Sequence, residues 1–198
     1  MSFESNQIIY VIFQKQMSTD KKIPLGIVHG RFQPPHNGHI QYIVEALERV
    51  EHLTIGICTP KICTQEEALE TGYPCTEELN PFSYEERVNM ISDTLNSCGI
   101  AKDRYSIIPF PSDYKNIQKI VPSETIFFIS HSGELDSKKK EYLENLGYKT
   151  EIILSLDSSR KESGQKIRDM IKNKDNLWKS LVPESVKKRI EELVSSRT

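Results

Sequence analysis

The chain has 198 residues, of which 37% are hydrophobic, and its 26 basic and 28 acidic side chains leave a formal net charge of −2. This length and apolar content are enough for one ordinary domain with a continuous core and a C-terminal appendage. The balanced charge excludes a large basic surface for nucleic acid, and no apolar run approaches the roughly 20 residues that span a bilayer, so we expect a cytoplasmic protein without nucleic-acid or membrane partners.

Residues 1–16 fit the pattern of the rest of the chain least well. They precede a polar linker at 18–22 and form an extra edge strand, a loose arm, or a segment upstream of the true start at Met17, and the sequence does not decide among these. The apolar run 8–13 is too short for a signal peptide and lacks its flanking signals. We therefore expect an arm at 1–22, a Rossmann-like domain at 23–160 and a helical segment at 161–198.

From residue 25 onward, short β-branched runs alternate with longer runs of helical periodicity, which is typical of a parallel sheet covered by helices. The pattern predicts strands over 25–29, 53–58, 105–110, 125–129 and 150–154, and helices over 40–50, 83–95, 136–146, 164–172 and 183–194. Ser83 and Glu86 form a capping box, Gly147 is a C-cap, and Pro183 lies in a first helical turn. The fold class is α/β, with a Rossmann-like five-stranded parallel sheet flanked by helices and a C-terminal helical appendage.

Residues 59–80 form a long polar connection interrupted by prolines and a glycine, which makes it a candidate lid or specificity loop. The chain has four cysteines, none in a Cys-x-x-Cys pair: Cys58, Cys63, Cys75 and Cys98. We expect reduced, structural thiols, with a metal or a disulfide in the 58–75 stretch as the alternative.

The segment that joins the first strand to the first helix is the most informative. It holds two histidines three residues apart, in the run Gly30-Arg31-Phe32-Gln33-Pro34-Pro35-His36-Asn37-Gly38-His39. Ligands bind at such turns of open parallel sheets because a helix N-terminus offers free N–H groups to an anion. Gly30 lets the backbone approach a ligand closely, and Gly38 keeps the space between the imidazoles open. An isolated pair would indicate packing or zinc, but the strand, the glycines and the helix favour function.

His36-Asn37-Gly38-His39 resembles the His-x-Gly-His signature of the nucleotidyltransferase superfamily, and the run 30–39 is most similar to its archaeal nicotinamide mononucleotide adenylyltransferases. Further matches follow in the same order at 80–87, 104–109, 163–168 and 181–186. The resemblance covers about residues 24–194. It implies transfer of a nucleotidyl group from ATP or CTP to a small phosphorylated acceptor, with release of pyrophosphate.

The resemblance also implies which residues act. His39 would contact the α-phosphate, with His36 beside it on the triphosphate, and Arg168 would hold the β- and γ-phosphates. Nucleotide or phosphate contacts are implied for Gly30, Arg31, Phe32, Gln33, Gly38, Arg87, Ser163 and Gly164. Mg²⁺ would be carried mainly by the phosphates, without side-chain ligands. A homo-oligomer is expected.

The resemblance is weaker where the acceptor would be recognised. There a Trp-containing segment after the third strand is replaced by 112–117, and a Ser-x-Asn-Pro element after the fourth by 130–134. A further change, Gln165 in place of a threonine, removes a hydroxyl that could bond a phosphate and does not fall on the acceptor side. Adenylyl transfer to nicotinamide or nicotinate mononucleotide is the leading interpretation. A cytidylyltransferase for a small phosphate or phosphonate, and a catalytically weak nucleotide-binding regulator, stay open. A class I aminoacyl-tRNA synthetase is disfavoured by the short chain.

Overall fold

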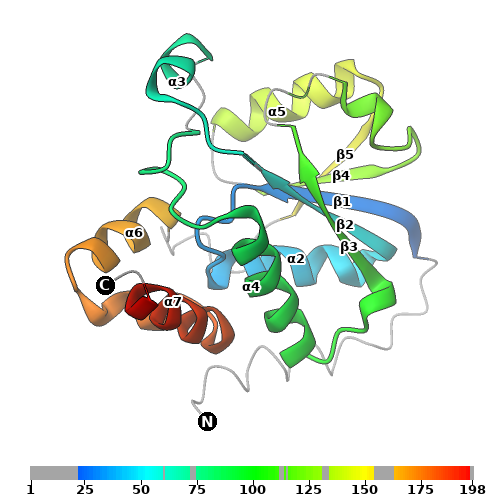
Figure 1. Ribbon diagram of the computed structural model, residues 1–198. Helices are drawn as coiled ribbons and strands as arrows, with labels where there is room; N and C mark the ends of the chain where they lie inside the picture. Colours follow the sequence, from blue (N-terminus) through cyan, green and yellow to red (C-terminus); the bar gives the residue numbers. More distant parts are fainter. Residues whose placement is uncertain are drawn as a thin grey trace.

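The computed structural model describes residues 22–59, 61–71, 75–111, 114, 116–130, 134–153 and 163–196, so the predicted arm at 1–16 lies outside the described residues. One all-parallel sheet forms the centre, with strand order β3-β2-β1-β4-β5. Its strands are β1 (Ile23–Gly30), β2 (Val50–Cys58), β3 (Tyr105–Phe110), β4 (Ile126–Ser130) and β5 (Lys149–Ile153). The predicted α/β class and the parallel sheet are therefore confirmed (Figure 1).

Helices cover both faces of this sheet. They are α2 (Asn37–Arg49), α3 (Gln65–Thr71), α4 (Tyr84–Ser97), α5 (Glu134–Asn145), α6 (Gly164–Lys172) and α7 (Glu184–Ser196), with short 3₁₀ turns η1 (Lys102–Arg104), η2 (Ile117–Lys119) and η3 (Asn176–Ser180). The predicted boundaries hold to within three residues. Two details differ, since α3 lies within the connection expected to be irregular, and Pro183 immediately precedes α7 rather than lying in its first turn.

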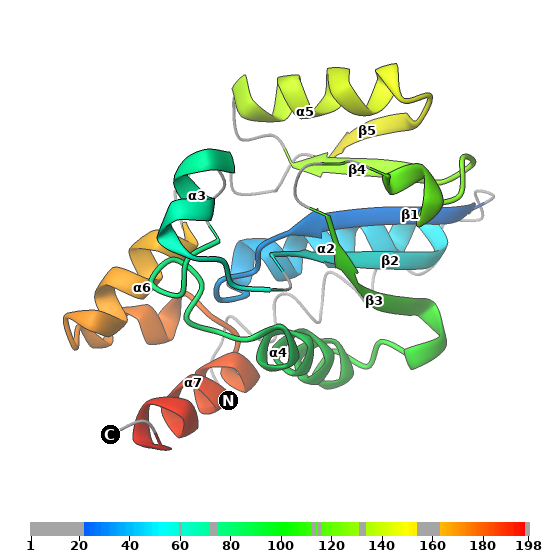
Figure 2. The same ribbon diagram turned by 45° about the horizontal axis from the view of Figure 1, so that its top comes forward.

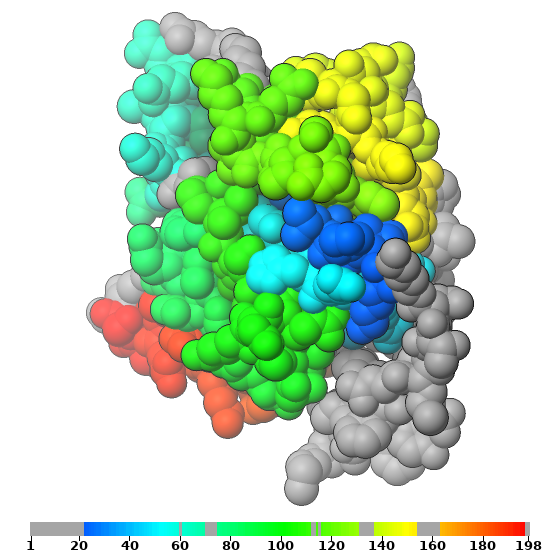
Figure 3. Space-filling view, turned by 90° about the vertical axis from the view of Figure 1, so that its right-hand side faces the viewer, coloured from blue at the N-terminus to red at the C-terminus, as the bar shows by residue number. Residues whose placement is uncertain are grey.

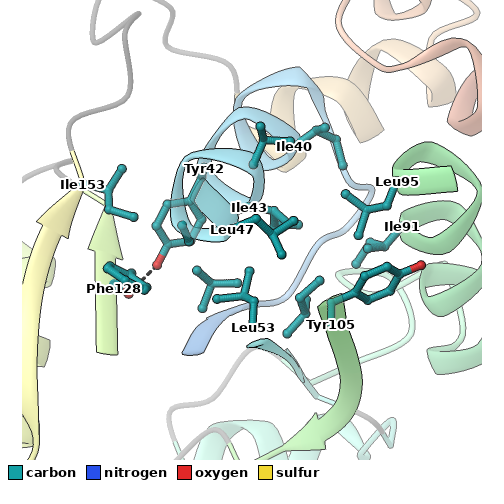
Figure 4. Close-up of a cluster of buried hydrophobic side chains, with 14 of the residues drawn as sticks. Ile40, Tyr42, Ile43, Leu47, Leu53, Ile91, Leu95, Tyr105, Phe128 and Ile153 are labelled. Carbon is teal, nitrogen blue, oxygen red and sulfur yellow. Dashed lines mark hydrogen bonds between the residues drawn. The ribbon is translucent and has the colours of Figure 1, made fainter. Parts of the chain in front are cut away.

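The larger core lies between the sheet and the helices α2 and α4. The apolar face of α2, including Ile40, Ile43 and Leu47, packs on the strands and on Ile91 of α4, as Figure 4 shows. The spacing of three and four residues along α2 places these side chains on one stripe, as its periodicity predicted. The hydroxyl of Tyr42 donates to the carbonyl of Phe128, which ties this helix to β4.

The opposite face of the sheet is covered by α5 and the η2 segment, which lie on the far side from α2 in Figure 2. Its core contains Ile27, Phe127 and Leu143, all fully buried. Gly56 of β2 matters here, because a Cβ atom at this position would come within 2.8 Å of the Phe110 ring. The missing side chain therefore lets that ring lie across β2.

The C-terminal helices form a third cluster on the outer side of α4. Met90 of α4 meets Ile167 of α6, and Trp178 of η3 closes the cluster together with Val186 and Ile190 of α7. α6 and α7 lie beside α4 in both ribbon views. The helical appendage therefore packs on the outer side of α4, whose other side packs on the sheet, and this fixes its position relative to the strand ends.

Local capping agrees with the sequence where the signal was strong. The Ser83 side chain accepts from the backbone N–H of Glu86, and the Glu86 carboxylate accepts from the N–H of Ser83, as the predicted capping box requires. Gly147 follows α5 with a φ of 91°, a conformation that costs a residue without a Cβ little. These caps fix where α4 begins and α5 ends.

The expectation that all four cysteines are reduced is wrong. Cys63 and Cys75 form a disulfide, and the N–H of Cys63 donates to the carbonyl of Cys75 at 2.9 Å. Cys58 and Cys98 are free thiols. The bridge brings the two sides of the α3 excursion together, a proximity that spacing along the chain does not reveal.

Figure 3 shows the end of the molecule where β1 and β2 begin, with parts of both strands visible in blue and cyan between green segments. The turn between β1 and α2 lies at the other end of these strands. None of the helices in the described part of the chain is long and apolar enough to cross a membrane.

Candidate active site

The turn between β1 and α2 is anchored by a buried aromatic ring. Phe32 is 1% exposed and has a φ of 51°, in the left-handed region. Its ring lies below Gly30, where a Cβ atom would approach it to 3.3 Å, and it meets the His39 ring edge-on at 4.9 Å between centroids. The Gln33–Pro34 peptide bond is cis. Phe32 therefore fixes the turn in the core rather than presenting a surface to a nucleotide.

The two histidines of the motif cap α2 reciprocally. The N–H of His39 donates to Nδ1 of His36, and the N–H of His36 donates to Nδ1 of His39, both at 3.4 Å. Their rings stack at 3.6 Å between centroids. A Cβ atom at Gly38 would lie 3.3 Å from His36 Nδ1. This corrects the expected role of Gly38, since the imidazoles touch each other directly and the glycine makes room for the His36 ring.

Both imidazoles are held neutral. Burial lowers the pKa of His36 to about 4. The pKa of His39 is also well below its ordinary value, first through burial and then through the charges of His36 and Arg31, with a hydrogen bond to the Pro34 backbone acting in the opposite direction. A neutral imidazole keeps one N–H, and this group can donate a hydrogen bond to an anionic oxygen.

Arg168 joins the C-terminal segment to this turn. Its guanidinium donates from Nη1 to the carbonyl of Gln33 at 2.6 Å and from Nη2 to the side chain of Gln165. The start of α6 comes equally close, because a Cβ atom at Gly164 would lie 2.4 Å from the Gln33 carbonyl oxygen. The structure therefore brings together the two motifs that are about 130 residues apart in the sequence, with separation 135 between Arg168 and Gln33.

Positive groups converge at this junction without full pairing. Nη1 of Arg31 and Nε of Arg168 are buried N–H donors that lack a hydrogen-bond partner. Burial, and after it the charge of Arg31, lowers the pKa of Arg168, while Asp169 opposes them. The charge of Arg31 also adds to the effect of burial on the pKa of His39. Buried donors are rarely left unpaired, and cations repel one another, so the two unpaired nitrogens stand out among the buried polar groups of this junction.

Three other expected phosphate contacts have structural partners. Arg87 is 1% exposed and donates to the backbone carbonyls of Arg31, Cys58, Thr59 and Ser83. Gln33 exchanges two hydrogen bonds with the backbone of Phe82. The Ser163 hydroxyl accepts from the N–H of Lys166 and caps α6. These residues hold the site together, and we do not carry the phosphate contacts expected for Arg87 and Gln33 into the proposed site.

Sequence reasoning missed several contributors. Asn37 donates from its backbone to the carbonyl of Leu181 and from its side chain to that of Ser180, which ties the motif to the end of η3. Gln165, noted only as a lost threonine, also bonds Asp169 and so orients Arg168. His29, placed only within a strand, is buried at the strand end. The sequence did contain a signal for this residue, because His29 is the one polar side chain at the end of an otherwise apolar strand.

The donors around the motif are nitrogens rather than carboxylates. Among the described residues, no group of three or more His, Cys, Asp or Glu side chains could hold a metal ion. N–H donors suit phosphate oxygens and repel a divalent cation. A divalent ion at this site would therefore be carried by the bound phosphates.

The chain matches known proteins over most of its length. Residues 27–174 match the cytidylyltransferase-like family. The chain is 30% identical over 180 residues to a phosphonoformate cytidylyltransferase of Streptomyces viridochromogenes, covering 89% of this chain and 95% of that protein. It is 33% identical over 174 residues to a nicotinamide-nucleotide adenylyltransferase of Saccharolobus solfataricus, covering 85% and 90%. Similarity thus extends to both of the activities that the sequence left open, and not mainly to the archaeal adenylyltransferases.

A solved structure agrees on the fold. It is a bifunctional NMN adenylyltransferase/ADP ribose pyrophosphatase of Francisella tularensis, complexed with AMP and a manganese ion, with a TM-score of 0.55 and 19% identity. The match covers 82% of this chain and 44% of that one, so this chain spans less than half of the bifunctional protein. With the strand-to-helix turn, the paired histidines and the family match over 27–174, this chain belongs to the cytidylyltransferase-like family of nucleotidyltransferases.

Proposed function

We propose that this chain transfers a nucleotidyl group from a nucleoside triphosphate to a phosphate or phosphonate oxygen of a small acceptor. The observation that carries the proposal is the junction of Arg31 and Arg168, each with a buried N–H donor that has no partner. A triphosphate would pair both donors and offset the repulsion between the two charges. The same junction would explain why α6 approaches the turn so closely.

The proposed reaction forms a bond between an acceptor oxygen and the α-phosphorus, and breaks the bond from that phosphorus to the bridging oxygen of pyrophosphate. The acceptor is already an anion, so no general base is needed. Catalysis then consists of holding two anions together and stabilising charge on the transferred group. His39, with His36 beside it, would donate to α-phosphate oxygens, and Arg31 and Arg168 would bind the leaving pyrophosphate.

The N-terminus of α6 adds to this phosphate site. This nine-residue helix begins at Gly164, against the carbonyl of Gln33. Free N–H groups in the first turn of a helix bind anions. Mg²⁺ bound to the triphosphate would reduce the repulsion between the phosphates and the acceptor.

We favour CTP as the donor and a small phosphonate or phosphate as the acceptor. A relative whose alignment with this chain covers 95% of its own length is a cytidylyltransferase. The sequence departs from the adenylyltransferases at 112–117 and 130–134, where the resemblance implies recognition of the acceptor. Adenylyl transfer to nicotinamide mononucleotide is the second candidate, supported by the 33% identical relative. These candidates differ in both substrates, so one set of assays separates them.

The test is a pyrophosphate-release assay with CTP or ATP and Mg²⁺ across a panel of acceptors. The panel contains phosphonoformate, methylphosphonate, glycerol phosphate and nicotinamide mononucleotide. We expect release with CTP and a small phosphonate or phosphate. Release only with ATP and the mononucleotide would select the second candidate, and no release with any pair would refute both.

His39→Ala tests the assigned chemistry. We expect kcat to fall by a hundredfold or more, by the usual size of a lost transition-state donor, with circular dichroism unchanged. His52→Ala is the matched control, because His52 lies near the start of β2, far from the carboxyl ends of the strands where the motif lies. Its ring is hydrogen-bonded to the Asp103 carbonyl and to Ser106. The activity of this variant should equal that of the unchanged protein. A His39→Ala enzyme that retains full turnover would remove His39 from the mechanism.

A further inference from the structure

A second histidine lies at the end of β1, and the reaction proposed above does not use it. His29 is 6% exposed, on the α5 side of the sheet. Its ring contacts Phe110 at 4.9 Å, Tyr114 at 5.4 Å and Phe127 at 5.9 Å between centroids. Gly56 pairs with His29 across β1 and β2, and its missing side chain is what lets the Phe110 ring reach this position.

One ring nitrogen of His29 is paired and the other is not. Nε2 lies 2.6 Å from the hydroxyl of Tyr114. Nδ1 is buried without a hydrogen-bond partner. Burial and the charge of Lys139 hold the pKa of this imidazole well below its ordinary value, so the ring is neutral. If Tyr114 donates to Nε2, then Nδ1 carries the proton and is an unused donor.

This donor lies next to the phosphate site. β1 borders β2 on one side and β4 on the other, and the strand order reverses there, which is where open α/β sheets bind ligands. The charges of both Lys139 and Arg31 act on the pKa of the Cys58 thiol, against the larger effect of burial. Cys58 therefore lies between the surroundings of His29 and the junction of Arg31 and Arg168. His29 is also separated from Arg31 by a single residue.

We propose that Nδ1–H of His29 binds a second anionic oxygen of the acceptor, a carboxylate close to the reacting phosphonate or phosphate. This inference rests on the proposed function and names the class of its acceptor. Tyr114 would position the ring through Nε2, and the surrounding aromatic rings would admit only a short acceptor. The positive charge of Lys139, which acts on both His29 and Cys58, favours an anion over a neutral group. Binding would pair a nitrogen that is otherwise buried and unsatisfied.

Two substitutions separate the nitrogens of His29. Asparagine places an amide near the position of Nδ1, whereas glutamine reaches the position of Nε2. We expect His29→Gln to raise KM for phosphonoformate about tenfold or more and to leave KM for CTP within threefold, since one hydrogen bond to a charged group is lost. His29→Asn should stay within about threefold of the unchanged protein for both substrates. His52→Gln, the same change on β2, is the control.

The acceptor itself provides the second comparison. Methylphosphonate lacks the carboxylate of phosphonoformate but keeps its phosphonate. We expect the unchanged protein to prefer phosphonoformate by at least tenfold in kcat/KM, and His29→Gln to remove most of that preference.

The outcomes distinguish the two proposals. Equal use of both phosphonates by the unchanged protein, or equal damage by His29→Asn and His29→Gln to both substrates, would assign His29 a purely structural role while nucleotidyl transfer stands. Absence of pyrophosphate release with every donor and acceptor would overturn both proposals.

Discussion

Single residues at this site differ in whether burial leaves their polar atoms paired. Arg87 is more deeply buried than Arg168, but it donates to four backbone carbonyls, whereas Arg168 keeps an unpaired Nε. A buried guanidinium whose three nitrogens all donate to the backbone is structural, and one with an unpaired nitrogen is available to a ligand. Burial has a different effect on His36 and His39, because it lowers their pKa values and so keeps both rings neutral.

The free energy of unfolding should fall as the pH drops from about 6.5 toward 4. An unfolded histidine takes up a proton near pH 6.5, while burial holds the pKa of His36 at about 4, so the unfolded state binds more protons in this window. His36 alone would account for roughly 3 kcal/mol across the window, at about 1.4 kcal/mol per pH unit. Urea denaturation at pH 7.5, 6.0 and 5.0 measures how the free energy of unfolding depends on pH.

His36→Asn is the matched variant for this prediction, because asparagine caps a helix but does not titrate in the window. It should show a shallower dependence on pH, whereas His52→Asn should keep the original one. Identical pH profiles for the His36 variant and the unchanged protein would contradict the prediction.

At the scale of elements, the site depends on how closely α6 approaches the turn after β1. Two hydrogen bonds from Asn37 hold the end of η3 against the same turn. The segment that follows α6 in the chain is therefore fixed at the turn through its backbone carbonyls, while α6 itself is held there by Arg168. The α3 excursion is held separately, by the disulfide between Cys63 and Cys75.

Gly164→Ala should impair the site through this approach. The added Cβ atom would lie 2.4 Å from the Gln33 carbonyl oxygen, so α6 or the turn must shift. We expect a loss of about 2 kcal/mol in stability, of the size of other overpacking changes, and at least a tenfold rise in KM for the triphosphate. Steady-state kinetics and urea denaturation measure both effects.

Gly99→Ala is the control for that change. Gly99 has a φ of 73° but open space around its Cβ position. The strain should cost about 1 kcal/mol without changing KM. If Gly164→Ala retains the KM of the unchanged protein, the close approach of α6 does not serve the phosphate site.

Thiol counting tests the disulfide. The denatured, unreduced protein should react at two thiols, those of Cys58 and Cys98, and the reduced protein at four. In the native state at pH 8, iodoacetamide should label Cys98 well before Cys58, because burial raises the pKa of the Cys58 thiol to about 11 and thiolate is the reactive form. Four reactive thiols before reduction would show that the bridge does not form in solution.

At the scale of the whole molecule, the junction of Arg31 and Arg168 joins the sheet domain to the C-terminal helices, and both of these parts pack on α4. α4 packs on the sheet with Ile91 and on α6 and α7 with Met90, so the C-terminal helices cannot move far without disturbing the sheet domain. The chain as a whole is nearly neutral, and two arginines, Arg31 and Arg168, lie together where the two parts meet. A triphosphate bound there would link them directly.

Triphosphate binding should therefore stabilise the entire chain. At a concentration one hundred times its Kd, a ligand adds about 2.7 kcal/mol. For a chain of this size that corresponds to a rise of roughly 5–10 °C in Tm. Thermal denaturation with CTP and ATP in turn measures the shift, and the nucleotide with the larger shift at equal concentration identifies the donor.

Arg168→Lys should lose most of this stabilisation, because an ammonium cannot reproduce the guanidinium fork. Arg104→Lys is the control, since Arg104 bonds the carbonyls of Leu47, Val50 and Glu51 at the other end of the sheet. A Tm that does not change with either nucleotide at saturating concentration would contradict the phosphate site.

The sequence by itself determined the parallel sheet, its helices and the turn that carries the histidines, because periodicity and capping are local properties of the chain. It also paired the motif at 30–39 with Ser163 to Arg168 through their resemblance to one family. Tertiary structure decided how these residues are used. Only the folded chain shows that Arg87 and Gln33 are consumed by backbone contacts, that Cys63 meets Cys75, and that Nδ1 of His29 is left without a partner. Each of these depends on which atoms lie nearby in space, and contacts between residues tens of positions apart are set by packing rather than by local sequence.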